Sequence, residues 1–244
     1  MMRVVIHRSA EAASRGLADF LARTLSRAPS SVLGLPTGRT PVPLYAELAR
    51  LYREGRIDFR RARTFNLDEF VGLGPRDAAS YHAFMRRHLF AHVNLAPERI
   101  EFLNGRARDW RREAARYERR LVAAGGLDLV IVGVGQNGHV GFNEPGSALE
   151  ARTHRVTLWP GTRRANAWLF GGGVRAVPRR ALSMGIGTIL SARGVVLLAT
   201  GRSKAAIVRR ALTGPITTRL PASLLQLHPN VVVVLDRDAA ASLR

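Results

Sequence analysis

The chain has 244 residues, which is enough to bury a full hydrophobic core, and we expect residues 1–244 to form one α/β domain. It contains no cysteine, which excludes disulfides, thiolate nucleophiles and zinc–thiolate sites. No apolar run approaches the roughly 18 residues of a membrane span, and the apolar start at 1–6 is too short for a signal peptide. We therefore expect a soluble, cytoplasmic protein with no membrane partner.

The charge is strongly positive, with 38 Lys and Arg against 18 Asp and Glu and a net charge of +20. Clustered cations bind nucleic acids by releasing counterions from phosphates. Here the arginines are scattered along the whole chain, without a basic tail or a recognisable nucleic-acid-binding module. We therefore expect a solvated, arginine-rich surface and no nucleic-acid partner, with an electrostatic preference for anionic substrates.

Seven short apolar runs predict buried strands, at 3–6, 31–35, 64–67, 100–103, 127–132, 195–199 and 231–235. Apolar residues at helical spacing between most of these runs predict helices, at 10–26, 41–53, 81–91, 109–124 and 203–212. This alternation predicts a doubly wound, mostly parallel sheet flanked by helices, that is, a Rossmann-like α/β fold.

The loop at 35–41, Leu-Pro-Thr-Gly-Arg-Thr-Pro, joins a predicted strand to a helix N-terminus. Free N–H groups and the helix dipole favour an anion there, so the loop is a candidate phosphate site. It is not a Walker A loop, because no Gly-Lys-Ser/Thr follows. Turn and cap chemistry alone is the alternative explanation.

Two carboxylates, Asp68 and Glu69, follow the predicted strand at 64–67. A carboxylate partly removed from water at this edge can have its pKa raised toward the range useful for taking a proton beside a carbonyl. One of them is therefore a candidate base, although an Asp at a strand end is often only a turn residue.

The loop at 133–145 is rich in glycine, follows the predicted strand at 127–132, and presents His139 and Glu144 as an acid/base pair. Its glycines also fit G-x-G-x-x-G, the dinucleotide-binding fingerprint. That fingerprint needs a helix at the third glycine and an acidic residue about 20 positions on. Pro145 and the carboxylate-free stretch 153–162 do not fit, so we favour an active-site loop.

His88 and His92 lie four residues apart on a predicted helix, a spacing that suits a metal ion. The glutamate of H-E-x-x-H is missing and no third ligand is evident. We therefore expect a solvated helix face and no metal. Lys204, the one lysine among the 38 basic residues, suits a phosphate contact, with chance survival on a helix surface as the alternative.

Five motifs together resemble the glucosamine-6-phosphate deaminase family, which is related to the 6-phosphogluconolactonases. They are LGLPTGRTP at 33–41, TFNLDEFVGL at 64–73, Ser80-Tyr81, GQNGHVGFNEP at 135–145 and PASLLQLHP at 221–229. The resemblance implies a fold of sugar-phosphate isomerase type. It also implies conversion of glucosamine 6-phosphate and water to fructose 6-phosphate and ammonia, with no metal or organic cofactor.

The resemblance also assigns roles to residues of this chain. His139 would move a proton between the ring oxygen and the C1 hydroxyl, with Asn137 and Glu144 orienting its imidazole. Asp68 would take the C2 proton and deliver it to C1. The phosphate-binding residues would be Thr37, Gly38, Arg39, Thr40, Lys204 and Arg163.

Two positions depart from the family pattern. Asn137 stands where some members have Asp, and Trp168 stands where an arginine usually contacts the phosphate from a mobile lid. We place this lid at about 158–178, around a cluster of three glycines, and expect Arg163 or Arg164 to substitute for the missing arginine, unless a different sugar phosphate is accepted.

Three alternatives stay open: a lactonase that uses His139, a deaminase for galactosamine 6-phosphate, and a noncatalytic sugar-phosphate sensor. Homo-oligomerisation also stays open. Some members are activated by N-acetylglucosamine 6-phosphate through serine, arginine and lysine side chains. This chain has Ala148, His154 and Val156 in those stretches, so we expect no such control and a hyperbolic rate curve.

Overall fold

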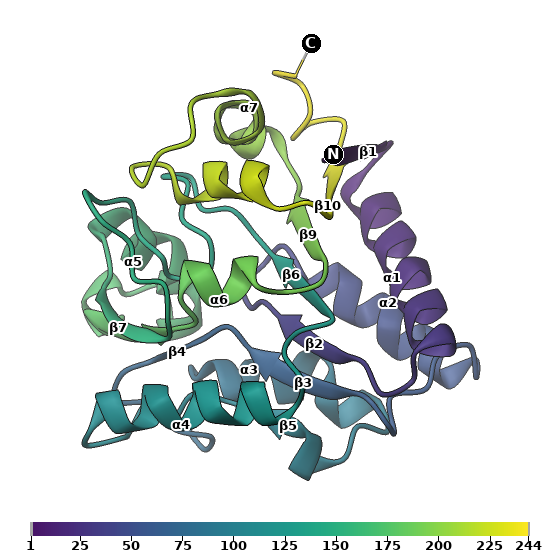
Figure 1. The fold of residues 1–244 in the computed structure, drawn as a ribbon, viewed down its shortest axis with the longest axis horizontal. Helices are drawn as coiled ribbons and strands as arrows, with labels where there is room; N and C mark the ends of the chain where they lie inside the picture. Colours follow the sequence, from purple (N-terminus) through teal and green to yellow (C-terminus); the bar gives the residue numbers. More distant parts are fainter. Residues whose placement is uncertain (1, 244) are drawn as a thin grey trace.

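Seven parallel strands form the central sheet, in the order β1–β10–β9–β6–β2–β3–β5 (Figure 1). The computed structural model describes residues 2–243. The strands are β1 (Arg3–His7), β2 (Val32–Leu35), β3 (Arg63–Asn66), β5 (Ile100–Glu101), β6 (Leu129–Val132), β9 (Val195–Ala199) and β10 (Val231–Asp236). Each coincides with a predicted run and every pairing is parallel, so the predicted fold class is confirmed.

Helices cover both faces of this sheet, and its central strands β2, β6 and β9 are therefore buried on both sides, whereas the edge strand β1 is partly exposed. In β6, Leu129 and Ile131 pack with one layer of helices, whereas Val130 and Val132 pack with the other, as the two-residue period of a strand requires. The first layer contains α1 (Ala10–Arg27), α2 (Val42–Arg53) and α3 (Tyr81–His88). The second contains α4 (Trp110–Ala123), α6 (Ile186–Leu190) and α7 (Ala205–Thr213).

A second, antiparallel sheet was not predicted. It consists of β4 (Asp68–Phe70), β8 (Arg180–Ser183) and β7 (His154–Thr157). The chain leaves the central sheet after Asn66 and enters β4 at Asp68, so Asp68 begins a new strand and does not close the predicted one. A strand of three residues is too short to show a two-residue period in the sequence, which is why it was missed.

The segment that follows β7 packs against the small sheet through a third apolar core. This segment contains α5 (Pro160–Asn166) and two 3-10 helices, η3 (Ala167–Phe170) and η4 (Val174–Ala176). The core joins Phe70 of β4 and Phe142 of the glycine-rich loop to apolar residues of the segment, among them Leu158, Ala167 and Val177. The small sheet therefore carries this segment to the edge of the central sheet.

The motif at 221–229 stabilises the fold. It forms the 3-10 helix η6 (Pro221–Leu227) and bonds mainly to backbone groups. Gln226 donates from Nε2 to the carbonyls of Ala211 and Gly214 at 2.9 and 3.0 Å. His228 is buried, with its Nε2 2.8 Å from the carbonyl oxygen of Ala192. These bonds fix the chain between α7 and β10, and they explain the motif without a catalytic role.

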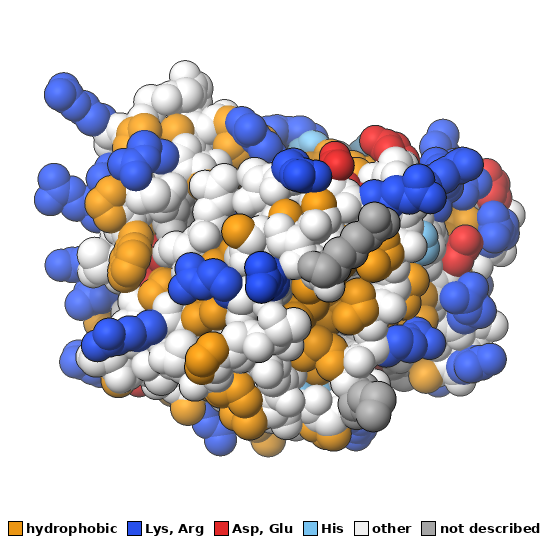
Figure 2. Space-filling view, turned by 90° about the horizontal axis from the view of Figure 1, so that it is seen from above, with side chains coloured by type: hydrophobic (Ala, Val, Ile, Leu, Met, Phe, Trp, Pro, Cys, Tyr) orange, Lys and Arg blue, Asp and Glu red, His pale blue; other side chains and the backbone are white. Residues whose placement is uncertain are grey.

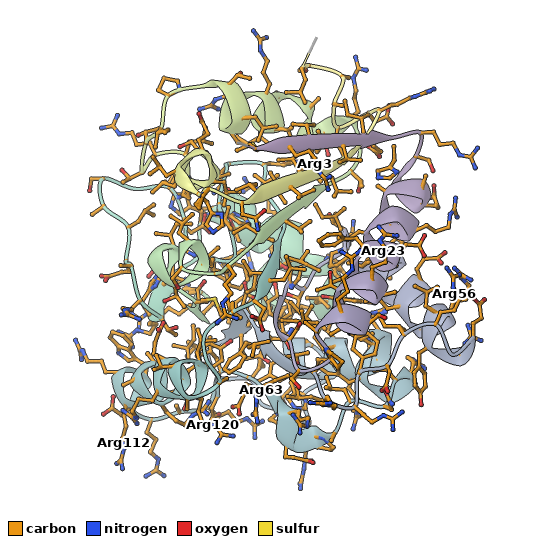
Figure 3. The ribbon with its side chains drawn as sticks, turned by 45° about the vertical axis from the view of Figure 1, so that its right-hand side comes forward. Arg3, Arg23, Arg56, Arg63, Arg112 and Arg120 are labelled. Atoms are coloured by element: carbon orange, nitrogen blue, oxygen red, sulfur yellow. The ribbon has the colours of Figure 1, made fainter. Side chains whose placement is uncertain are left out.

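The basic residues are dispersed over the surface. Lys and Arg side chains on the face shown in Figure 2 are separated by apolar and uncharged groups, and labelled arginines in Figure 3 lie on several sides of the molecule. No helix within residues 2–243 is both long and apolar enough to cross a membrane.

Candidate active site

Four neighbouring strands, β9, β6, β2 and β3, direct their carboxyl ends toward one cavity of about 790 Å³. Ligands of open α/β sheets bind at this edge. The chain segments that leave these strands carry most of the predicted site residues to the cavity wall: Thr37, Gly38, Arg39, Thr40, Asp68, Asn137, His139 and Lys204. The central sheet thus brings together residues that are up to 167 positions apart in the sequence.

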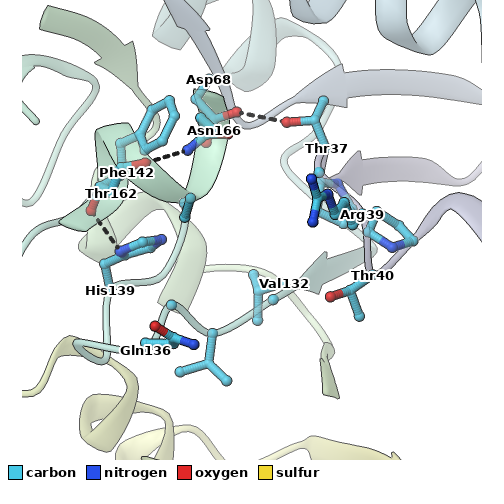
Figure 4. Close-up of a pocket in the computed structure, with 18 of the residues that line it drawn as sticks. Thr37, Arg39, Thr40, Asp68, Val132, Gln136, His139, Phe142, Thr162 and Asn166 are labelled. Carbon is cyan, nitrogen blue, oxygen red and sulfur yellow. Dashed lines mark hydrogen bonds between the residues drawn. The ribbon is translucent and has the colours of Figure 1, made fainter. Parts of the chain in front are cut away.

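Asp68 lies in the cavity wall with only 5% of its surface exposed. The Thr37 hydroxyl donates to its Oδ1 at 3.5 Å, as Figure 4 shows. Burial, and then the negative charge of Glu69, raise the pKa of Asp68 from 3.8 to about 8, although the bond from Thr37 opposes the shift. A carboxylate in this condition binds a proton far more strongly than one in water, which suits a base that removes a proton from carbon.

Glu69 has a different position, because its oxygens are occupied by the backbone. Its Oε1 accepts hydrogen bonds from the N–H groups of Phe70 and Tyr81 at 2.9 and 3.0 Å, and its Oε2 accepts one from His82 at 3.0 Å. Burial outweighs these bonds and raises the pKa of Glu69 to about 7. Glu69 therefore ties β4 to the first turn of α3, and Asp68 is the carboxylate that faces the cavity.

His139 is oriented by polar groups on one side of its ring. Its Nδ1 lies 3.6 Å from Glu144 Oε2 and 3.4 Å from Thr162 Oγ1. Asn137 donates to the same Glu144 oxygen at 2.7 Å, and the backbone N–H of Trp159 donates to Oε1 at 3.0 Å. Burial acts to raise the pKa of Glu144, but the hydrogen bond and the charge of His139, followed by hydrogen bonds from Thr162 and the Trp159 backbone, lower it overall. An ionised Glu144 thus holds Nδ1, which leaves Nε2 for a ligand.

Two glycines of the loop lie against functional side chains of the cavity. A Cβ on Gly135 would lie 2.2 Å from the His139 ring, so the imidazole rests on bare backbone. Gly141 has φ +57°, and a Cβ there would lie 3.7 Å from Asp68 Oδ2. Gly135, one of the three glycines that matched the dinucleotide fingerprint, therefore serves the packing of a histidine.

The cavity wall also carries cations. Arg39, Arg164 and Lys204 line it, and none of them forms an ion pair with a carboxylate within residues 2–243. Lys204 donates from Nζ to the carbonyl of Val134 at 2.8 Å, and burial lowers its pKa. In Figure 4, Arg39 and Thr40 lie across the cavity from His139. This arrangement provides a candidate anion site across the cavity from His139.

Arg163, the predicted phosphate ligand from the lid, is not among the residues that line the cavity. Its guanidinium donates to the carbonyls of Val174 and Val177 at 2.8–3.2 Å and so braces the segment after α5. Arg164, the next residue of α5, lines the cavity instead. Successive residues of a helix point about 100° apart, so sequence reasoning could not choose between the two.

Two further lining residues, Thr162 and Asn166, carried no signal of their own in the sequence, and Tyr81 was marked only by the Ser80-Tyr81 motif. The Tyr81 hydroxyl donates to Asn166 Oδ1 at 2.9 Å, and Thr162 contacts His139. Tyr81 is in α3, whereas Thr162 and Asn166 are in α5, so these contacts fasten α5 to the catalytic wall. Polar residues on a short helix without an apolar pattern give no signal from which these contacts could have been predicted.

The fold and this site define a sugar-phosphate-binding α/β enzyme of isomerase type. Residues 7–234 match the family described as glucosamine-6-phosphate isomerases/6-phosphogluconolactonase, and the chain belongs to this family. It is 45% identical over 242 residues to a glucosamine-6-phosphate deaminase of Halothermothrix orenii, covering 99% of this chain and 100% of the relative. It is 48% identical over 223 residues to glucosamine-6-phosphate deaminase 1 of Giardia intestinalis, covering 91% and 84%.

Solved structures agree with these relatives. A monomeric glucosamine-6-phosphate deaminase superimposes with a TM-score of 0.95 at 43% identity, covering 99% of this chain and 100% of that one. A 6-phosphogluconolactonase from Trypanosoma brucei has a TM-score of 0.77 at 20% identity, covering 100% and 99%. The second likeness shows the fold alone.

Replacing Asp68 by Asn is expected to stabilise the protein. The pKa of the Asp68 carboxyl is near its ordinary value in the unfolded chain and about 8 in the folded protein. Between these two pH values the unfolded chain binds fewer protons than the folded protein. The free energy of unfolding therefore falls as the pH rises. The neutral amide removes this loss. We expect the melting temperature of Asp68→Asn to exceed that of the wild type at pH 8, by roughly 2–4 °C for each kcal/mol, and the difference to shrink toward pH 5. A lower melting temperature at pH 8 would contradict the assigned burial.

Replacing Gly135 by Ala is expected to displace the His139 ring, because the new methyl group overlaps it. A misplacement of about 1 Å can lower the catalytic rate by roughly 100-fold. Gly133→Ala is the matched control, since a Cβ there meets nothing within 4 Å. Equal catalytic rates for the two variants would show that the ring position is not essential.

Proposed function

We propose that this enzyme of the family is a deaminase that converts glucosamine 6-phosphate and water to fructose 6-phosphate and ammonia. We place it in the cytoplasm, with a small sugar phosphate as its partner. The observation that carries the proposal is one cavity lined by a buried carboxylate, an oriented imidazole and three cations that form no ion pair within residues 2–243. Relatives that are 42–48% identical and bear this name support the choice of reaction.

The proposed reaction begins with ring opening. His139 Nε2 takes the proton of the C1 hydroxyl and returns it to the ring oxygen, which gives the open-chain aldehyde. Glu144 stabilises the charged imidazole, and Asn137 holds Glu144 in place. An Asn at 137 leaves the histidine with a single carboxylate neighbour among the groups described above.

Asp68 performs the next step. It takes the proton from C2 while a proton of the substrate's ammonium group moves to the C1 oxygen, which leaves an enolamine across C1 and C2, and Asp68 then delivers its proton to C1. The product is an imine at C2, and water adds to it and releases ammonia. The pKa of about 8 supports this role, because the fraction of Asp68 that is ionised near neutral pH is a stronger base than an ordinary carboxylate.

The phosphate of the substrate anchors the far end of the sugar. We propose that it binds the loop 37–40, Lys204 and Arg164, with Arg164 in the place expected of Arg163. The positive end of the α2 dipole adds to these contacts. Binding energy from this remote group orients C1 and C2 between Asp68 and His139.

A mobile lid completes the proposed cycle. The segment 158–178 contributes Trp159, Thr162 and Arg164 to the cavity wall, and its glycine cluster includes Gly171 and Gly172, both at positive φ. Such a segment can open to admit the sugar and close to exclude water.

A base beside carbon distinguishes deamination from lactone hydrolysis. Cleavage of a lactone ester needs an activated water and no removal of a proton from carbon, so it gives no task to Asp68. The proposal is tested by measuring ammonia and fructose 6-phosphate with glucosamine 6-phosphate, galactosamine 6-phosphate and 6-phosphogluconolactone as substrates. We expect equal amounts of both products from glucosamine 6-phosphate and a hyperbolic dependence on its concentration.

Asp68→Asn serves as the control in this assay. We expect turnover to be lost while the variant still binds glucosamine 6-phosphate. Unchanged turnover would refute the base, and ester cleavage without ammonia in the wild type would favour the lactonase. A sigmoidal rate curve relieved by N-acetylglucosamine 6-phosphate would contradict the expected absence of allosteric control.

Lys204→Ala is expected to weaken substrate binding with a smaller effect on kcat. A hydrogen bond to a charged group contributes about 1.5–3 kcal/mol, which corresponds to a rise in KM of roughly 10- to 150-fold. Arg202→Ala is the matched control, because Arg202 is an exposed cation of the same short helix that does not line the cavity. Equal KM values for the two variants would remove Lys204 from the phosphate site.

A further inference from the structure

Trp168 connects two walls of the cavity. It lies in η3 and lines the cavity, and Cζ of Arg39 is 5.2 Å from its ring centroid. This distance is typical of a cation–π contact. Arg39 is in the loop between β2 and α2, so the contact joins the segment 158–178 to the predicted phosphate loop.

The indole of Trp168 is itself held by the protein core. Its ring is 6.2 Å from that of Phe84, at an interplanar angle of 73°, and Phe84 is fully buried in α3. Trp168 also packs against the apolar core that α1, α2 and α3 share with the central sheet. Arg39 is therefore stacked on a support that is anchored from behind.

The guanidinium of Arg39 keeps its N–H donors free. Within residues 2–243 its side chain forms no hydrogen bond or ion pair, and Figure 4 shows it in the cavity near Thr37 and Thr40. Arg164 and Lys204 line the same cavity, so like charges disfavour placing a third cation there. The π face of Trp168 offsets this repulsion without neutralising the charge of Arg39, as a carboxylate partner would.

We propose that Trp168 is a specificity-determining residue, which holds the Arg39 guanidinium ready to bind a phosphate monoester at the anion end of the cavity. The planar guanidinium of Arg39 donates two N–H groups to one phosphate. Because stacking on the indole already restricts this side chain, less conformational entropy is lost when the phosphate binds. The missing lid arginine is thus replaced by a cation from the opposite wall and an aromatic support from the lid. The inference rests on the proposed function for the sugar, but it requires only a phosphate ester.

A double-mutant cycle on phosphate binding tests this pair without any turnover. Inorganic phosphate is titrated calorimetrically into the wild type, Arg39→Met, Trp168→Leu and the double variant. Methionine keeps an apolar stem, and leucine keeps apolar packing against Phe84, so both changes target the stack. We expect Arg39→Met to raise Kd about 10-fold and Trp168→Leu to raise it about 3- to 10-fold. The double variant should bind no more weakly than Arg39→Met alone.

Two further variants keep the test decisive. Trp168→Phe retains an aromatic face and is expected to bind phosphate more tightly than Trp168→Leu. Trp159→Leu is the matched control, because Trp159 lines the same cavity from the same segment, and it should combine additively with Arg39→Met. If Trp168→Leu leaves Kd unchanged, or if its effect multiplies with that of Arg39→Met, the proposal is overturned.

The same titration separates this inference from the proposed reaction. If Arg39 and Trp168 are coupled in phosphate binding but the enzyme releases no ammonia, the role of Trp168 in holding Arg39 is supported and the deaminase proposal is refuted. If the enzyme releases ammonia but the two residues are not coupled, the deaminase proposal is supported and the role of Trp168 is refuted.

Discussion

Burial of the Asp68 carboxylate is the constraint on which the site depends. The chain leaves the central sheet after Asn66 and pairs at once with β8, which places Asp68 opposite Ser183 and away from water. A buried charge destabilises the fold unless it is compensated, and among residues 2–243 Thr37 alone donates to the Asp68 side chain. The neighbouring Glu69 is compensated by three backbone N–H groups and fixes the strand in place. One carboxylate of the pair thus secures the backbone, and the other is left with a raised pKa in the cavity.

The site has two halves that come from different parts of the chain. The loop after β6 and the first residue of β4 supply His139 and Asp68, whereas the loop after β2, the turn after β9 and α5 supply the cations. A sugar phosphate has matching halves, since its reactive carbons lie at one end and its charge at the other. Lactonase structures share the fold at low identity, so the chemistry is decided by what the strand ends carry and not by the sheet.

Much of this arrangement could be predicted from the sequence, because buried parallel strands leave continuous apolar runs and their ends meet at one edge. All seven central strands follow from this rule. The small sheet does not, because β4 has three residues and its pairing with β8 depends on a partner 113 positions away. The choice between Arg163 and Arg164 depends on the rotation of a short helix. The stacking of Arg39 on Trp168 depends on two segments that meet only in the folded protein. In the sequence, Trp168 indicated only that the usual lid arginine was missing.

The ionisation of Asp68 can be measured directly by carbon-13 NMR on protein labelled in its aspartate side chains, with the resonance assigned by its absence in Asp68→Asn. For the substrate-free protein, titration should give a midpoint of about pH 8. A midpoint near pH 4 would mean that water reaches this carboxylate freely, and the account of the site as a buried base would then be wrong.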